Sequence, residues 1–216
     1  MSDGSDAGVG KPARVEFGQL KSEDAVRRTA NALVANGIPA IVAESRSEAR
    51  DLVRSLLPGG AEVFNNTSRT LQSAGVDDDI ERSGRYQPLR LRLYQMDREM
   101  QAREMRSLAA SPDYVVGSVH AVTEGGSLLI ASASGSQLGP IVSGAGHVIL
   151  IVGGQKIVPD VDAGIRRIYE YSWPLEDQRA REVYGVPSGV NNILIINRAV
   201  AEARITTILV NEILGF

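Results

Sequence analysis

The chain has 216 residues, of which 43% are hydrophobic and 23% charged, and its formal net charge at pH 7 is -3. This length and composition predict one large globular domain. The sequence contains no cysteine, which excludes disulfides, thiol catalysis and cysteine-ligated iron–sulfur clusters within it. With only two histidines we expect no metal site. The acidic balance gives no reason to expect a nucleic-acid or membrane partner.

The first residues, MSDGSDAGVGKP, are polar and rich in glycine. They lack the apolar core of a signal peptide, and no apolar stretch of the chain is long enough to cross a bilayer. We therefore predict a disordered tail over residues 1–18, one domain over residues 19–216, and a cytoplasmic protein.

The first half of the predicted domain alternates helices and strands. Helical spacing over residues 21–35, with Ser22 as the predicted cap, is followed by an apolar strand at 38–43. Ser45 and Glu48 have the spacing of a capping box before a second helix, and residues 61–64 form a second strand. This alternation is typical of a parallel sheet covered by helices.

A short helix is predicted to start near Thr70 and to end at Gly75, and an amphipathic helix is predicted over 97–109. Later strands follow one another without room for crossover helices, which favours a mixed, mostly parallel sheet. These strands are expected at 113–119, 127–132, 147–152 and 191–197, with a last strand near the C-terminus and helices at 159–171 and 174–184.

Glu124 is a lone acid in an apolar stretch and stands directly before Gly125 and Gly126. Two glycines between apolar runs predict a hairpin turn, so Glu124 should end a strand, where a carboxylate can act as nucleophile or general base. The alternative is an exposed acid at a turn. His120 should point to the same face of the strand, either as a proton-transfer partner or as an ordinary histidine of the sheet.

The loop SASGSQLGP at 132–140 consists mostly of small residues. Backbone N–H groups can approach a ligand closely where side chains are small. Ser134, Gly135, Ser136 and Gln137 are therefore candidates for an anion-binding nest. The alternative is a plain connection between two elements.

Two further segments offer cations. Ser68, Arg69 and Thr70 begin a predicted helix, where an anion can bind and Arg69 can add a bidentate contact; the alternative is simple capping by Ser68. Gln155 and Lys156 follow an apolar strand, and ligands of open α/β sheets bind beyond the carboxyl ends of strands. Lys156 is thus a candidate counter-ion for an acidic ligand, or else a surface lysine.

The remaining charged and aromatic residues are expected to have structural roles. Between residues 82 and 106 lie seven arginines, with Asp97, Glu99 and Glu104 among them, and this mixed charge predicts a solvated face. Trp173 and the neighbouring tyrosines are expected to pack helices onto the sheet. The sequence has neither a Walker loop nor a G-x-G-x-x-G after the first strand, so a dinucleotide cofactor has no support.

Several stretches together resemble the lactate-utilisation (LUD) domain family: DYVVGSVHAVTEGGSLLIASASGSQLGP, VGGQKIVPDVDAGIRRI, PLEDQRAREVYG and NNTSRTLQSAGVDDDIERSGRY. The likeness extends over nearly the whole chain. It implies an α/β three-layer sandwich similar to the NagB/RpiA/CoA-transferase-like fold. It also implies a role in the utilisation of lactate or related organic acids, without an electron carrier in this chain.

The stretch Thr123-Glu124-Gly125-Gly126 looks like the strand end that carries the catalytic glutamate of several class I CoA-transferases. That likeness implies that Glu124 attacks a CoA thioester, which would be a substrate. No other cofactor is expected.

These features predict one pocket at the strand ends for a small anionic metabolite: a carboxylate, a phosphate ester or a CoA thioester. Its expected walls are residues 68–70, 124–126, 134–137 and 155–156. Two other interpretations stay open. One is a non-catalytic assembly or regulatory subunit that partners an iron–sulfur oxidoreductase, and the other is a sugar-phosphate isomerase or sensor. A homo-oligomer also stays open.

Overall fold

A computed structural model describes residues 12–201 and 203–216 of the chain. Its main sheet has six strands, all parallel to their neighbours. The central strand β7 is buried on both faces, and its side chains alternate between two cores. In spatial order the strands are β1 (Ala40–Ala43), β10 (Ile205–Val210), β7 (His147–Gly153), β4 (Tyr114–Gly117), β2 (Glu62–Asn65) and β3 (Gln87–Pro88).

A second, four-stranded sheet contains the antiparallel pairs. The mixed sheet expected from the sequence is therefore divided, because the antiparallel strands pair with one another and not with the parallel sheet. In spatial order its strands are β8 (Ile157–Val158), β5 (Ala121–Thr123), β6 (Leu128–Ser132) and β9 (Asn192–Ile196).

The hairpin predicted at Gly125-Gly126 is confirmed, since it joins β5 to β6. Gly126 has a positive φ of 82°. A Cβ atom at Gly126 would lie 2.7 Å from the backbone of Ala32. The second glycine is thus required by the turn and by the close approach of the hairpin to the first long helix.

Helices cover the sheets. The predicted start of the first helix is confirmed, because Ser22 accepts a hydrogen bond from the backbone of Ala25. The helices are α1 (Glu23–Ala35), α2 (Arg46–Leu56), α3 (Arg69–Ala74), α4 (Val76–Arg82), α5 (Leu89–Gln95), α6 (Ala102–Ala110), α7 (Val161–Arg167) and α8 (Trp173–Tyr184). Short 3-10 turns form η1 (Val15–Gly18) and η3 (Gly154–Lys156), and π-helical turns form η2 (Pro140–Gly144) and η4 (Ile168–Ser172).

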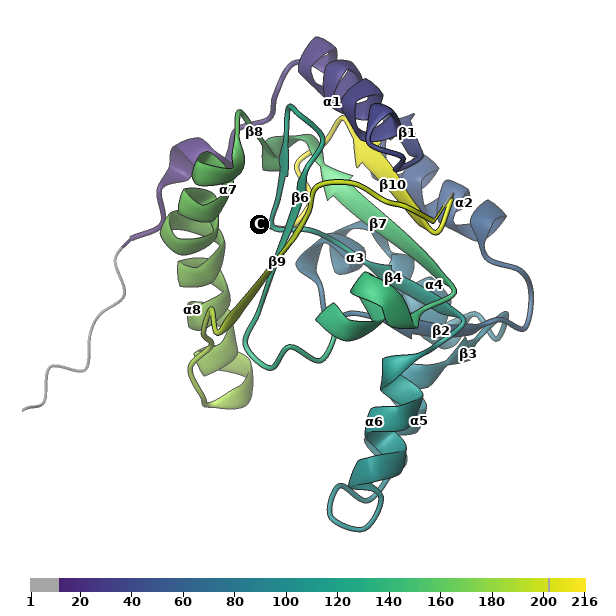
Figure 1. Cartoon of the computed structure of the whole chain (residues 1–216). Coiled ribbons are helices and arrows are strands. Elements are labelled where there is room, and N and C mark those ends of the chain that lie inside the picture. Colours follow the sequence, from purple (N-terminus) through teal and green to yellow (C-terminus); the bar gives the residue numbers. More distant parts are fainter. Residues whose placement is uncertain (1–11, 202) are drawn as a thin grey trace, which may run out of the picture.

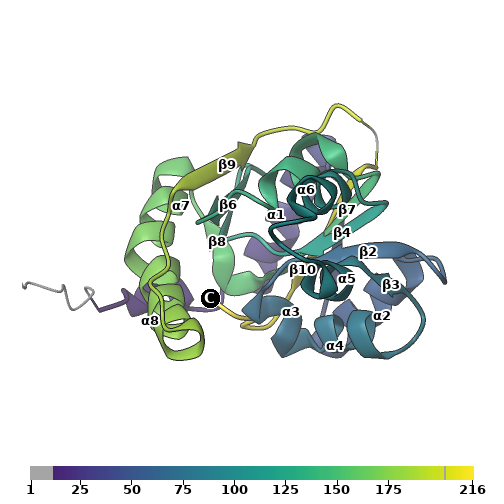
Figure 2. The ribbon, with the colours of Figure 1, turned by 90° about the horizontal axis from the view of Figure 1, so that it is seen from below.

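The helices and the two sheets form layers, and the order of these layers explains which residues are buried. Helices α2, α3 and α4 cover one face of the six-stranded sheet (Figure 2). The other face packs against α1 and the four-stranded sheet, and α7 covers the outer face of that second sheet. The α/β three-layer sandwich predicted from the sequence is confirmed.

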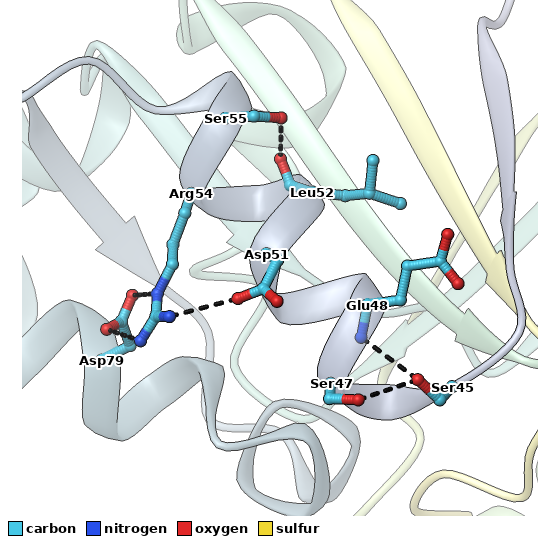
Figure 3. Close-up of polar contacts among 8 residues, drawn as sticks. All are labelled: Ser45, Ser47, Glu48, Asp51, Leu52, Arg54, Ser55 and Asp79. Carbon is cyan, nitrogen blue, oxygen red and sulfur yellow. Dashed lines mark hydrogen bonds and ion pairs between the residues drawn. The ribbon is translucent and has the colours of Figure 1, made fainter.

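Helix α2 is fixed at both ends by polar contacts (Figure 3). At its start, Ser45 accepts a hydrogen bond of 3.2 Å from the backbone N–H of Glu48. Near its end, Arg54 forms two hydrogen bonds with Asp79 of α4, of 3.0 and 2.6 Å. This bidentate pair ties two helices on the same face of the sheet together.

Helices α5 and α6 project from the body of the molecule (Figure 1), and residues 89–110 are called the arm below. The helix predicted over 97–109 begins later, at Ala102. Neither α4 nor α5 was predicted, because seven residues are too few to show a helical hydrophobic period.

The N-terminal prediction needs correction. Residues 1–11 lie outside the described residues, but residues 15–18 form η1 and do not belong to a disordered tail. The backbone N–H of Arg14 donates to the carbonyl of Glu170, and Phe17 accepts from Arg167. Composition alone could not show these long-range contacts. Within the described ranges, no helix combines the length and apolar character needed to cross a membrane.

Candidate functional site

A cavity of about 670 Å³ opens at the carboxyl ends of β2 and β4. Its lining comes from the start of α3, the arm, the end of β6 with the loop after it, and the start of α8. Figure 1 shows the arm and α8 as two projections on either side of this region. Strand ends of parallel sheets are where α/β proteins bind ligands.

The lining is strongly basic. In the described part of the chain, six of the lining residues are Lys or Arg and one, Glu176, is an acid. Glu176 forms an ion pair with Arg179, and Arg90 pairs with Glu81. The other four lining cations form no ion pair with any described residue; they are Arg69, Arg98, Arg106 and Lys156.

Lys156 is the most deeply placed of these cations. It sits in η3 directly after β7 and is only 2% exposed. Its Nζ atom donates to Oγ1 of Thr70 at 2.8 Å, Oγ of Ser118 at 3.1 Å and the carbonyl of Val119 at 3.0 Å. Three neutral acceptors match the three N–H bonds of an ammonium group. Burial, with a smaller effect of Arg167, holds the pKa of Lys156 well below its ordinary value.

The turn that carries Lys156 is held by the C-terminal segment. Nε2 of Gln155 donates to the carbonyls of Leu214 and Gly215, at 2.9 and 3.2 Å. Gly153 allows the close approach, because a Cβ there would lie 2.8 Å from the nitrogen of Leu214. Gln155 does not line the cavity. Its hydrogen bonds give it a supporting position.

His120, which the sequence offered either as a proton-transfer partner of Glu124 or as an ordinary histidine of the sheet, lines the cavity, and Glu124 does not. Its Nδ1 atom accepts a hydrogen bond of 3.0 Å from the backbone N–H of Ala131. Burial, followed by the charges of Lys156 and Arg167, lowers the pKa of His120 to about 3. The imidazole is therefore neutral at physiological pH.

Arg167 of α7 supports this region from behind. It is fully buried, and it donates to the carbonyls of Phe17 and His120 and to Oγ of Ser172. Burial lowers the pKa of Arg167 to about 10, so the guanidinium stays charged. Its Nη2 atom has no partner among the described residues. Arg167 thus joins η1, the end of the β4–β5 link and η4 around the cavity.

The serine loop after β6 contributes three of its four predicted residues. Ser134, Ser136 and Gln137 line the cavity, and Gly135 does not. The backbone N–H groups of Gly135 and Ser136 already donate to Oγ of Ser132 and Oγ of Ser134. The loop therefore offers hydroxyl groups more readily than the free backbone amides expected from the sequence.

The segment at the start of α3 lies entirely in the lining, as Ser68, Arg69 and Thr70. The side chain of Ser68 makes no capping hydrogen bond, in contrast to the alternative interpretation of the sequence. Arg69 donates to Gln72 at 2.8 Å. Thr70 accepts from Lys156 and donates to the carbonyl of Leu214.

Glu124, Gly125 and Gly126 lie elsewhere. None of them lines the cavity, and the hairpin that carries them lies against the end of α1, where Asn36 donates to the carbonyl of Gly125. Glu124 is exposed. The wall that residues 124–126 were expected to form is thus missing from the cavity. A catalytic role for Glu124 stays a prediction to which this cavity gives no support.

Sequence reasoning overlooked several lining residues. Arg98 and Arg106 were assigned to a solvated face, yet both line the cavity from the arm. Trp173 lines it from α8 and is 38% exposed, although it was expected to pack against the sheet. The arginine density was a visible signal, but its placement depends on how the arm leaves the sheet. Across residues 12–201 and 203–216, no group of three or more His, Asp or Glu side chains could hold a metal ion.

Comparison with known proteins shows the fold and the family of this chain. The chain is similar to a DUF162 family protein from Deinococcus radiodurans, whose crystal structure aligns with a TM-score of 0.54 over 89% of this chain and 99% of that chain. The two sequences are 10% identical, so this likeness shows the fold alone. No curated protein matches the chain. The model of the LUD domain family matches residues 26–213, and the chain therefore belongs to that family.

Proposed function

We propose that this LUD-domain protein binds a small organic anion in the cavity at Lys156 and serves the utilisation of lactate or a related organic acid. The observation that carries the proposal is the buried ammonium group of Lys156, which has no carboxylate partner among the described residues. A buried charge without a counter-ion costs free energy. An anion in the cavity would supply that counter-ion.

The rest of the lining supports the same conclusion. Arg69, Arg98 and Arg106 leave a positive field around the mouth of the cavity, which would attract an anion from solution. The hydroxyls of Ser68, Ser134 and Ser136 can donate to its oxygen atoms.

The size of the cavity points to the class of ligand. Cavities of roughly 300–1,000 Å³ enclose drug-sized molecules. A cavity of about 670 Å³ leaves room beyond a three-carbon acid such as lactate. Leu93, Tyr94, Met105 and Trp173 supply apolar surface for the remainder of a larger anion. A phosphate ester or part of a CoA thioester fits this description, and lactate itself would occupy only a part.

The test is a thermal-shift panel of L-lactate, pyruvate, acetyl-CoA, free CoA, ribose 5-phosphate and inorganic phosphate. A ligand at a hundred times its dissociation constant should raise the unfolding temperature by roughly 5–10 °C. Stabilisation by acetyl-CoA but not by free CoA would identify a thioester ligand. An unchanged unfolding temperature across the whole panel would contradict the proposal.

The matched controls are Lys156→Met and Lys21→Met. Both remove one positive charge, but Lys21 is exposed and lies outside the lining of the cavity. We expect Lys156→Met to weaken binding about 10- to 100-fold, since the positive charge that attracts the anion is lost. Lys21→Met should bind as the wild type does. Equal binding by both variants would mean that Lys156 is not the counter-ion.

A further inference from the structure

The hydrogen bond at Nδ1 fixes the protonation state of His120. A backbone N–H can only donate, so Nδ1, at 3.0 Å from the nitrogen of Ala131, must carry a lone pair. The proton of the neutral ring then resides on Nε2. A flipped ring would place a carbon atom against this N–H group and would lose the bond.

The remaining nitrogen of the ring is left for a ligand. His120 lines the cavity, and its Nε2 atom forms no hydrogen bond with a described residue. Lys156 is its neighbour, since the ammonium group is hydrogen-bonded to Ser118 and Val119, the two residues before His120. Arg167 donates to the carbonyl of His120 itself. The charged groups that act on the ring are both cations, Lys156 and Arg167.

We propose that His120 donates a hydrogen bond through Nε2–H to an oxygen atom of the ligand, and that the nearby charge of Lys156 stabilises this oxyanion at the floor of the cavity. The inference rests on the proposed function. It assigns His120 as a neutral hydrogen-bond donor and excludes a role as general base, since the only lone pair of the ring is used by Ala131.

This assignment also names the chemical group that the floor of the cavity selects. A hydrogen-bond donor beside a buried cation favours the oxygen of a carboxylate, a phosphate or a polarised carbonyl, and it disfavours an ammonium or a hydroxyl donor. The anionic end of the ligand is therefore placed at His120 and Lys156, and its apolar part is placed toward Trp173 and the arm.

The first measurement is nitrogen-15 NMR of the histidine rings in the ligand-free protein. We expect Nδ1 of His120 to be unprotonated and Nε2 protonated throughout the range from about pH 5 to 8. The signals of His120 are assigned by their loss in His120→Asn, which leaves His147 as the other histidine. A ring protonated on Nδ1, or one that titrates near about pH 6.5, would overturn the inference.

The second measurement compares two substitutions by calorimetric titration with pyruvate and with inorganic phosphate. The amide oxygen of His120→Asn can still accept from Ala131, but the distal donor is lost. The longer side chain of His120→Gln can place an N–H group where Nε2–H was. We expect His120→Asn to weaken binding at least about tenfold, and His120→Gln to recover part of the loss.

The outcomes separate this inference from the proposed function. Undiminished binding of both probes by a folded His120→Asn protein would overturn the inference and leave the proposed function intact. Binding of neither probe by the wild-type protein would overturn the inference, and an unchanged unfolding temperature across the whole thermal-shift panel would overturn both. If His120→Asn does not fold, the NMR result on the wild-type ring decides the assignment. A response to pyruvate alone or to phosphate alone distinguishes a carboxylate from a phosphate at the same donors.

Discussion

Nζ of Lys156 and Oγ1 of Thr70 are 2.8 Å apart at the floor of the cavity, although 86 positions separate the two residues in the chain. One comes from the turn after β7 and the other from the first turn of α3. The contact joins two of the segments that the sequence predicted for the site. It also shows why Lys156 is not the surface lysine of the alternative interpretation, because the start of α3 packs over it.

The burial of Lys156 predicts a distinctive pH dependence of stability. Its pKa is lowered in the folded protein and returns to its ordinary value of 10.5 on unfolding. Between these two values the unfolded chain binds more protons, so the free energy of unfolding rises with pH. The difference in free energy of unfolding between wild type and Lys156→Met should therefore increase toward pH 10.5 and level off above it.

Urea denaturation at a series of pH values measures this difference, with Lys21→Met as the control that shows no such trend. Saturating phosphate should reduce the pH dependence, because a bound anion raises the pKa of the lysine again. A difference that stays constant across the alkaline range would contradict the placement of a buried charge at this position.

A second prediction concerns the backbone contact that holds the same turn. Gly153→Ala would place a Cβ atom 2.8 Å from the nitrogen of Leu214 and 2.9 Å from the oxygen of Glu212. Backbone atoms cannot move aside cheaply, so we expect a loss of about 1–3 kcal/mol in the free energy of unfolding. Gly139→Ala is the control, because nothing lies within 4 Å of its added Cβ. Equal stability of the two variants would refute this packing.

A third prediction uses the pair that Figure 3 shows between α2 and α4. The Arg54 guanidinium lowers the pKa of Asp79 below its ordinary 3.8. The stabilisation is thus fully present above pH 3.8 and is lost as the pH falls through the folded pKa. At pH 7, Asp79→Asn should lower the unfolding temperature several times more than Asp78→Asn, whose carboxylate makes a more exposed pair with Arg82. In strong acid the Asp79→Asn protein should unfold at the wild-type temperature.

Local signals in the sequence were sufficient for much of the fold. Ser22 and Ser45 cap the helices that they were predicted to cap, and Gly75 ends α3 in the left-handed conformation with φ of 67°. The hairpin at Gly125-Gly126 is also local. Each of these features depends on residues within one turn of chain, so the pattern alone carries the physical cause.

The parts of the site that sequence reasoning missed depend on long-range contacts. His120 owes its protonation state to Ala131 on the paired strand, and Arg106 lines the cavity because the arm projects beside it. The same dependence on long-range contacts explains why Glu124 lies away from the cavity that the sequence predicted for it. Its place before a glycine turn suggested a site, but the hairpin packs against α1, away from the cavity.

Trp173 gives a fourth prediction, since it is the only tryptophan of the sequence and it lines the cavity. Its Nε1 atom donates to the carbonyl of Ser188 at 3.1 Å, which fixes the indole at the cavity wall. Binding of a ligand that fills the apolar part of the cavity should change the fluorescence of Trp173. Titration with acetyl-CoA measures this change, and Trp173→Phe should abolish the signal while the thermal shift persists. A thermal shift with acetyl-CoA that leaves the fluorescence of the wild type unaltered would place the ligand away from α8.

The last prediction concerns Glu124→Gln. Because Glu124 is exposed and lies outside the cavity, we expect this variant to bind the same anions as the wild type with unchanged affinity. Its unfolding temperature should also stay within about a degree, since an exposed carboxylate that pairs with no cation of the described residues adds little stability. Calorimetric titration of Glu124→Gln and Lys156→Met side by side measures the contrast. A CoA-transferase-like role would instead require that Glu124→Gln abolish turnover of a CoA thioester while binding persists. That result would mean that the hairpin moves to the cavity when the ligand is bound.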